Sequence, residues 1–446
     1  MALIYRNRED LLADSGIQVG ESHLKINNLE YFKEVVVNNL VETLVNSDSI
    51  PLRDLCYRVV KTAAEEFGVF PSSIQALYEA RAKDGWTHFT VPAMNLRTLT
   101  YDSARAVFRS AKKINAGAFI FEIARSEISY TKQRPQEYSS QVILAAIKEG
   151  FAGPIFLQGD HFQVDAKKYR QDKEIEIKQL KDLISEAIEA GFYNIDIDSS
   201  TLVDLFELSI PDQQALNSDV CADLTKFIRE QQPEGLEISI GGEIGEVGKK
   251  NSTLEELHAF MQGYLSKIDG LTPISKISVQ TGTSHGGVVN PDGSIAEVKI
   301  DFDTLKALSQ MARTEFGLAG AVQHGASTLP NDSFSLFLKY ECAEIHLATE
   351  FQNIIYEFFP MSLITDIQAW LHTYCSAEKT PEMSESQFIY KTRKKALGPF
   401  KKEIYSLPDE IKENIFLALE KEVLFLFEQL NIKETRGLVG KYIKTD

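Results

Sequence analysis

Eight short apolar runs alternate with longer amphipathic stretches between Thr87 and Glu350, and this alternation limits the fold more than any other feature of the chain. The runs are rich in β-branched and aromatic residues, and each ends near a glycine or a polar cluster. They cover residues 87–93, 116–124, 153–159, 193–198, 236–242, 274–282, 318–325 and 342–348. Between them, segments such as 175–190 and 301–312 carry an apolar stripe at helical spacing. The pattern predicts buried parallel strands joined by crossover helices.

Eight strand–helix units within about 250 residues favour a (β/α)8 TIM barrel, an α/β fold, over the alternative of an open, doubly wound sheet. We place the barrel at residues 86–360, after an N-terminal helical extension at 1–85 and before a C-terminal helical segment at 361–446. The last long helix carries an apolar stripe that is typical of core or of a subunit interface. The stripe consists of Ile415, Leu419, Val423, Leu426 and Leu430.

Composition excludes several classes of protein. The formal net charge of −17 argues against nucleic-acid binding, which requires clustered basic residues. No apolar stretch approaches the roughly 18 residues of a membrane span, and the first ten residues lack a secretory signal. The four cysteines form no Cys-x-x-Cys pair, which fits reduced thiols. We therefore expect a cytoplasmic protein with a small-molecule ligand and with neither a nucleic-acid nor a membrane partner.

Histidines gather where the predicted strands end. The loops that follow barrel strands form the active face, and half of the eight histidines fall at or near such positions. These four are His161, His285, His324 and His346. A lone histidine at such a place is more often a core residue, but three of them with carboxylates between suit zinc or another divalent metal with one open position. We predict His161, His285 and His324 as ligands, with Glu243 and Asp198 as orienting groups or as a further metal contact.

Two glycine-bearing strand ends indicate an anion site. Residues 282–287 and 324–327 follow the sixth and seventh strands, where barrels commonly bind phosphate through backbone N–H groups. Residues 330–333 supply helix-capping side chains before the predicted helix at 334–340. The N–H groups of Gly325, Ala326 and Ser327 are therefore candidate phosphate donors, and tight turns are the alternative interpretation.

The order and spacing of these motifs resemble the class II, metal-dependent fructose-bisphosphate aldolase family, including its tagatose-bisphosphate relatives. The resemblance covers about residues 85–359. The matching stretches are 91–95, 159–161, 242–248, 281–287, 301–305, 324–327 and 347–350. It implies a homo-oligomeric, zinc-dependent lyase that reversibly cleaves fructose 1,6-bisphosphate, or a close ketose phosphate, to dihydroxyacetone phosphate and an aldehyde.

The resemblance also assigns roles to residues. The metal would be held by His161, His285 and His324 with Glu243 beside it, and Asp160 would be the acid/base group. The substrate and its phosphate would be held by Asn95, Gly286, Gly325, Ser327, His346 and Thr349.

The chain departs from the family in five places, one of which is the end of the second strand, where residues 122–126 lack the Gln-x-Ser found in many relatives. It reads His-Gly-Ala-Ser-Thr at 324–328, where the family usually has His-Gly-Gly-Ser-Gly. It has His346 where the family commonly has asparagine, so this histidine is a different polar contact or a fourth metal ligand. Neither Lys250 nor Asn251 matches the mobile-loop glutamate that serves some relatives as base, and no C-terminal arginine matches the one that binds the distal phosphate in some members.

These departures leave open which residue is the base and which substrate is cleaved. The candidate bases are Glu246, Glu255 and Glu256. One alternative substrate is a singly phosphorylated ketose. The alternative from another class is a noncatalytic barrel subunit that binds a sugar phosphate and supports a partner enzyme. A Schiff-base mechanism is disfavoured, because the candidate lysines Lys249 and Lys250 lie in a polar loop.

Overall fold

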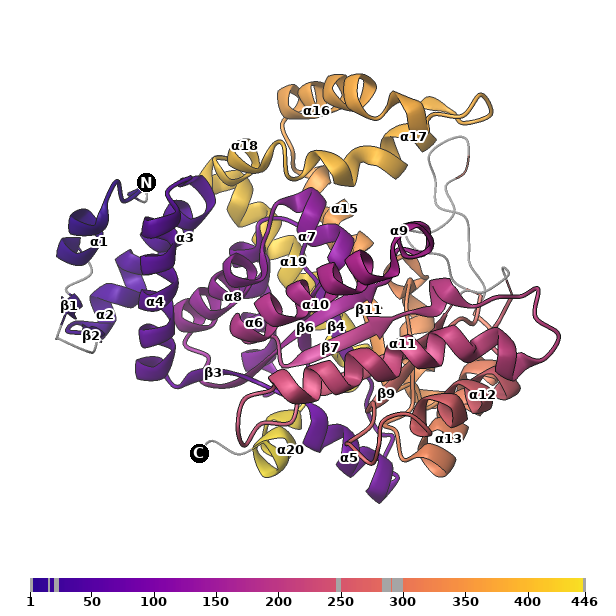
Figure 1. Cartoon of the computed structure of the whole chain (residues 1–446). Helices are drawn as coiled ribbons and strands as arrows, with labels where there is room; N and C mark the ends of the chain where they lie inside the picture. Colours follow the sequence, from indigo (N-terminus) through magenta and orange to yellow (C-terminus); the bar gives the residue numbers. More distant parts are fainter. Residues whose placement is uncertain are drawn as a thin grey trace.

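Eight parallel strands form a closed ring that helices surround (Figure 1). The structure is a computed structural model, and it describes residues 3–14, 17–19, 24–245, 250–282, 290 and 300–443. The ring strands are β4 (Val91–Asn95), β5 (Ile120–Ala124), β6 (Gly153–Gln163), β7 (Asn194–Asp198), β8 (Ser239–Gly245), β9 (Lys276–Val279), β10 (Ala321–Gln323) and β11 (Glu344–Leu347). Each strand pairs with its neighbour in chain order, and β11 pairs with β4 to close the ring. The predicted (β/α)8 barrel is confirmed.

The helices that follow the ring strands form the outer layer. They are α6 (Thr100–Lys113), α7 (Arg125–Thr131), α8 (Pro135–Glu149), α9 (Ala166–Gln171), α10 (Lys173–Glu189), α11 (Ile210–Gln231), α12 (Leu254–Leu265), α13 (Phe302–Phe316), α14 (Phe334–Lys339) and α15 (Thr349–Glu357). Short helical turns lie at η2 (Ser200–Leu202), η3 (Ala326–Thr328) and η4 (Asn331–Ser333). No helix in the described ranges is long and apolar enough to cross a membrane.

Local sequence explains where the barrel elements begin and end. The Asp301 carboxylate accepts the N–H of Thr304 and so starts α13, and Gly317, with φ of 69°, ends it in a left-handed conformation that costs glycine little. All five residues of β4, β5 and β7 are buried, as expected for strands covered on both faces.

The N-terminal extension is mostly helical, and it also contains short strands that its sequence did not predict. Its elements are α1 (Arg8–Asp14), β1 (Ile17–Val19), β2 (Leu24–Ile26), α2 (Leu29–Tyr31), the π-helical η1 (Phe32–Val36), α3 (Val37–Asn46), α4 (Ile50–Phe67), β3 (Val69–Ser72) and α5 (Gln75–Asp84). Strand β3 pairs in parallel with the first residues of β6, outside the ring. A four-residue strand with a proline inside it, Pro71, shows no alternation that a sequence pattern could reveal.

The C-terminal segment returns to the barrel as a series of helices. They are α16 (Met361–Tyr374), η5 (Ser376–Glu378), α17 (Glu385–Thr392), η6 (Arg393–Ala396), α18 (Lys401–Tyr405), α19 (Asp409–Gln429) and α20 (Thr435–Tyr442). Helix α19 packs on the barrel helix α6, and its predicted apolar stripe is buried there as core. Helix α16 lies at the upper edge of the view in Figure 1, and η6 contacts α7, which follows β5.

One buried carboxylate joins both added segments to the barrel. Glu137 in α8 has no exposed surface, and it forms ion pairs with Arg53 of α4 and with Lys401 of α18. The Arg53–Glu137 distance is 3.0 Å. The N-terminal and C-terminal segments are therefore linked through the same barrel helix.

Candidate active site

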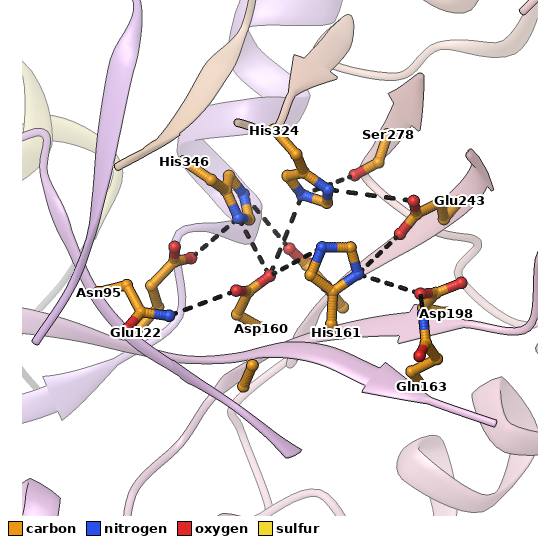
Figure 2. A network of polar contacts seen from close by, with 12 residues as sticks. Asn95, Glu122, Asp160, His161, Gln163, Asp198, Glu243, Ser278, His324 and His346 are labelled. Atoms are coloured by element: carbon orange, nitrogen blue, oxygen red, sulfur yellow. Dashed lines mark hydrogen bonds and ion pairs between the residues drawn. The ribbon is translucent and has the colours of Figure 1, made fainter. Parts of the chain in front are cut away.

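The end of β6 carries the two adjacent residues on which the site is built, Asp160 and His161. The pairing of β6 with β7 shifts register between Gly159 and Phe162, and inside this bulge His161 has φ of 38°, a left-handed backbone that is strained for a histidine. A Cβ atom at Gly159 would lie 2.6 Å from the ring of Phe162, so the bulge requires glycine there. Bulges re-aim side chains, and the His161 ring lies between Asp160 on one side and Asp198 and Glu243 on the other (Figure 2).

Two carboxylates hold one nitrogen of the His161 ring. The Nδ1 atom lies 3.0 Å from Asp198 Oδ2 and 3.1 Å from Glu243 Oε2. Gln163 donates to the same Asp198 oxygen at 2.5 Å. Burial acts to lower the pKa of His161, but the charges of Asp160 and Glu243 and the bond to Asp198 raise it well above its ordinary value. Carboxylates that bind one ring nitrogen orient the other, which leaves Nε2 facing the interior of the site.

A second histidine, His324, faces the same point from the end of β10. Its ring centroid lies 4.1 Å from that of His161. The Nε2 atoms of His161 and His324 lie 3.9 Å and 4.0 Å from the same oxygen, Asp160 Oδ1. Ligands of a tetrahedral zinc ion are separated by about 3.4 Å, given bond lengths of about 2.1 Å. The two imidazole nitrogens are therefore close enough to hold a small divalent metal, with the Asp160 carboxylate beside it.

A further histidine, His346, which we predicted as a polar contact or a fourth metal ligand, is engaged on both ring nitrogens. Its Nδ1 lies 3.1 Å from Asp160 Oδ1 and 3.1 Å from Glu122 Oε2, and its Nε2 lies 2.7 Å from Glu344 Oε1. Its ring centroid is 4.1 Å from that of His324. Burial acts to lower the pKa of His346, but the charges of Glu122 and Asp160 raise it well above the ordinary value.

Beneath these residues, a charged layer fills part of the barrel interior, where branched apolar side chains are usual. Lys276 of β9 lies 2.5 Å from Glu344 Oε1 and 3.0 Å from Asp196 Oδ2, and it donates to Gln158 Oε1 at 2.7 Å. Burial acts to raise the pKa of Glu344, but Lys276 and the neighbouring histidine lower it to about 2, whereas burial raises the pKa of Asp196 to about 6. A Cβ atom at Gly241 of β8 would lie 2.2 Å from Asp196 Oδ1, so this layer has room only for glycine there.

A cavity of about 790 Å³ opens above Asp160, His161 and His324. The predicted substrate residues that line it are Asn95, Gly325, Ser327, His346 and Thr349. Asn95 donates to Glu127 at 2.5 Å and to Asp160 Oδ2 at 3.5 Å, and the Ser327 hydroxyl accepts the N–H of Thr349 at 3.0 Å. Two predicted residues, His285 and Gly286, lie outside the described residues.

Five basic side chains that the sequence analysis did not single out also line this cavity: Arg97, Arg125, Lys167, Lys168 and Lys394. Arg97 follows β4 and forms an ion pair with Glu127 at 2.7 Å. Lys394 comes from η6, and burial together with the charge of Arg97 lowers its pKa. Nothing in the sequence pattern relates Lys394 to the strand ends that form the rest of the wall.

The described candidates for a base lie elsewhere. Glu256 accepts the N–H of Thr253 at the start of α12 and forms an ion pair with Lys250 at 2.9 Å. Glu255 is exposed on the same helix. Neither is among the described residues that line the cavity. Glu246 lies outside the described residues.

Comparisons with known proteins agree with this geometry. The chain matches the class-II fructose-bisphosphate aldolase family over residues 75–406. No curated protein sequence matches it. A fructose-bisphosphate aldolase structure from Campylobacter jejuni is 18% identical, with 82% of this chain and 97% of that chain covered and a TM-score of 0.51.

Two further solved structures share the fold. One is described as a probable tagatose 6 phosphate kinase from Sinorhizobium meliloti 1021, at 13% identity, with 78% and 100% of the two chains covered and a TM-score of 0.55. The other is the fructuronate-tagaturonate epimerase UxaE from Cohnella laeviribosi, at 11% identity, with 77% and 81% covered and a TM-score of 0.55. At such identities the likeness shows the fold alone, whereas the family match extends over most of the sequence. The chain therefore belongs to the class-II fructose-bisphosphate aldolase family.

Proposed function

We propose that the protein is a zinc-dependent aldolase that reversibly cleaves fructose 1,6-bisphosphate, or a close ketose phosphate, to dihydroxyacetone phosphate and an aldehyde. The observation that carries this proposal is the position of Asp160, whose Oδ1 lies 3.9 Å from His161 Nε2 and 4.0 Å from His324 Nε2 at the floor of one cavity. An acid/base group and two metal ligands thus face the same cavity.

Each described residue has a separate part in this proposal. When bound, a divalent metal supplies Lewis acidity that stabilises negative charge developing on the ketose oxygens. His161 and His324 would hold it together with His285, and Asp198 and Glu243 keep the His161 ring in place. Asp160 accepts the proton of the substrate hydroxyl during cleavage and returns it to the aldehyde oxygen during condensation.

The charges of the cavity wall support an anionic substrate. Five basic side chains, Lys394 among them, and four carboxylates line the cavity together with Gly325 and Ser327, while the chain as a whole carries a formal charge of −17. Local cations in an acidic protein favour phosphate at that place over other surfaces. We infer that Lys394 binds the phosphate of the aldehyde half, and that the loop at 325–327 binds the other phosphate.

The proposal is tested by cleavage assays on metal-loaded protein with fructose 1,6-bisphosphate, tagatose 1,6-bisphosphate and fructose 1-phosphate. Triose phosphate release is followed before and after treatment with a chelator, and zinc is then restored. We expect chelator-sensitive cleavage of at least one ketose, lost in His161→Ala and retained in His372→Ala, which changes an exposed histidine of α16. Absence of cleavage with every ketose would contradict the proposal, and an epimeric ketose without triose would indicate epimerase chemistry.

A noncatalytic barrel subunit is the second candidate. The observation that favours it is that Glu255 and Glu256 lie away from the described cavity wall, so neither supplies a base. Such a subunit would bind fructose 1,6-bisphosphate in calorimetry and retain metal without turnover. Turnover by the purified chain alone would exclude it.

A further inference from the structure

His346 connects the acid/base group of the site to the charged layer of the barrel interior. On one side its Nδ1 lies 3.1 Å from Asp160 Oδ1. On the other side its Nε2 lies 2.7 Å from Glu344 Oε1, an oxygen that also lies 2.5 Å from Lys276 Nζ. The four groups thus form one chain of alternating cationic and carboxylate groups, in which each member is at most 6% exposed.

The contacts of Glu344 explain why the imidazole has one orientation. Glu344 accepts hydrogen bonds from Tyr78 of α5 and from Gln158 of β6, in addition to its ion pair with Lys276. A carboxylate held from three sides cannot turn to follow the ring, so the ring must follow the carboxylate. A histidine whose far nitrogen is bound by a fixed carboxylate is itself fixed in tautomer and orientation.

The same contacts argue against the two roles that the sequence suggested for His346. A metal ligand needs a ring nitrogen with a free lone pair, and both nitrogens here face carboxylate oxygens at 3.1 Å or less. A substrate contact needs a polar atom turned to the cavity. The residue lines the cavity, but one ring nitrogen is directed to Asp160 and Glu122 (Figure 2) and the other lies 2.7 Å from Glu344 Oε1.

We propose that His346 is a positioning residue, anchored by Glu344, that sets the plane of the Asp160 carboxylate. This inference rests on the proposed role of Asp160 as acid/base group. With His346 fixing Oδ1, the second oxygen of Asp160 faces Asn95, 3.5 Å away, at the edge of the cavity. A carboxylate free to rotate would present its oxygens to substrate in the productive orientation for only part of the time.

The experiment uses one variant of His346, one variant of Glu344 and one matched control. His346→Asn keeps a donor of shorter reach near Asp160 but cannot also reach Glu344. Glu344→Gln keeps the shape of a side chain that lies below the cavity. Glu137→Gln is the control, because it removes the charge of an equally buried, lysine-paired carboxylate that is not among the described residues lining the cavity.

We expect His346→Asn and Glu344→Gln each to lower kcat at least tenfold, with KM and metal content within twofold of wild type. We expect Glu137→Gln to keep the kcat of wild type. Loss of metal in His346→Asn would identify a ligand, and a raised KM at unchanged kcat would identify a substrate contact. Either result would overturn the proposal. Circular dichroism verifies that each variant is folded. If Glu344→Gln does not fold, the result for His346→Asn decides whether the proposal holds.

A structural readout separates this inference from the proposed function. Crystal structures of zinc-loaded wild type and Glu344→Gln are compared, whether or not the protein cleaves any ketose. We expect the His346 ring and the Asp160 carboxylate to turn in the variant while His161 and His324 keep their positions. An unchanged Asp160 carboxylate would refute the positioning role even if the aldolase activity were confirmed.

Discussion

Replacement of Lys394 by methionine tests whether the C-terminal segment helps to select the substrate. The ammonium group is half-buried in the cavity wall, and no carboxylate of the described ranges lies within 4.0 Å of it. It lies 6.0 Å from the centroid of the Tyr130 ring, and a phosphate would supply an anionic partner. Methionine keeps the length of the side chain and removes only its charge, so Lys394→Met measures that single contact.

The size of the effect follows from the environment of the group. A hydrogen bond between two charged groups contributes about 1.5–3 kcal/mol. Because Lys394 is only partly buried, we expect about 2 kcal/mol, which corresponds to roughly 30-fold in binding. KM for fructose 1,6-bisphosphate should rise by this factor in Lys394→Met, whereas KM for fructose 1-phosphate, which lacks the distal phosphate, should change less than twofold.

The matched control is Lys395→Met, in the same helical turn. Its ammonium group pairs with Glu378 at 2.5 Å and is not among the described groups that line the cavity. Equal changes for the two substrates in Lys394→Met would refute the reasoning, and so would a change of similar size in Lys395→Met.

Three further predictions concern stability. Glu137→Gln should lower the free energy of unfolding by about 3 kcal/mol in urea titrations, because it leaves a buried lysine ammonium of α18 without its anion; a loss below 1 kcal/mol would contradict this. Gly241→Ala should cost at least about 2 kcal/mol, since its Cβ would lie 2.2 Å from Asp196 Oδ1, whereas Gly440→Ala, with nothing within 4 Å, should cost nothing. Burial raises the pKa of Asp102 to about 6, so its contribution to stability is present below about pH 4 and is lost as the pH rises through 6. Asp102→Asn should therefore gain on the order of 2 kcal/mol over wild type at pH 7 and match it near pH 4, and a difference independent of pH would exclude this explanation.

The barrel was predictable because its signal is local and repeated. Each strand is an apolar run of a few residues, and eight of them in alternation with helices leave few arrangements. Once the strands are assigned, the positions of their carboxyl ends are known too. His161 and His324 were therefore expected at one face of the barrel. The left-handed backbone of His161 was not predictable, because it depends on a register shift between β6 and β7 that the sequence of β6 does not encode by itself.

The charged layer and the position of Lys394 in the cavity wall depend on contacts between residues that are distant in the sequence. Lys276 and Glu344 are 68 positions apart, and each sits within a run that otherwise reads as an apolar strand. Only closure of the ring brings them together. Lys394 enters the cavity wall because the C-terminal segment folds back onto α7. Homo-oligomerisation and a cytoplasmic location stay predictions, and light scattering would test the first.

The central claim is that Asp160 transfers protons beside a metal held by His161 and His324. The direct test measures metal content and kcat on the same preparations of wild type, His324→Ala and Asp160→Asn. We predict that His324→Ala loses both metal and cleavage, and that Asp160→Asn retains metal while kcat falls at least about 100-fold. Cleavage by Asp160→Asn within threefold of wild type, at full metal content, would contradict the account.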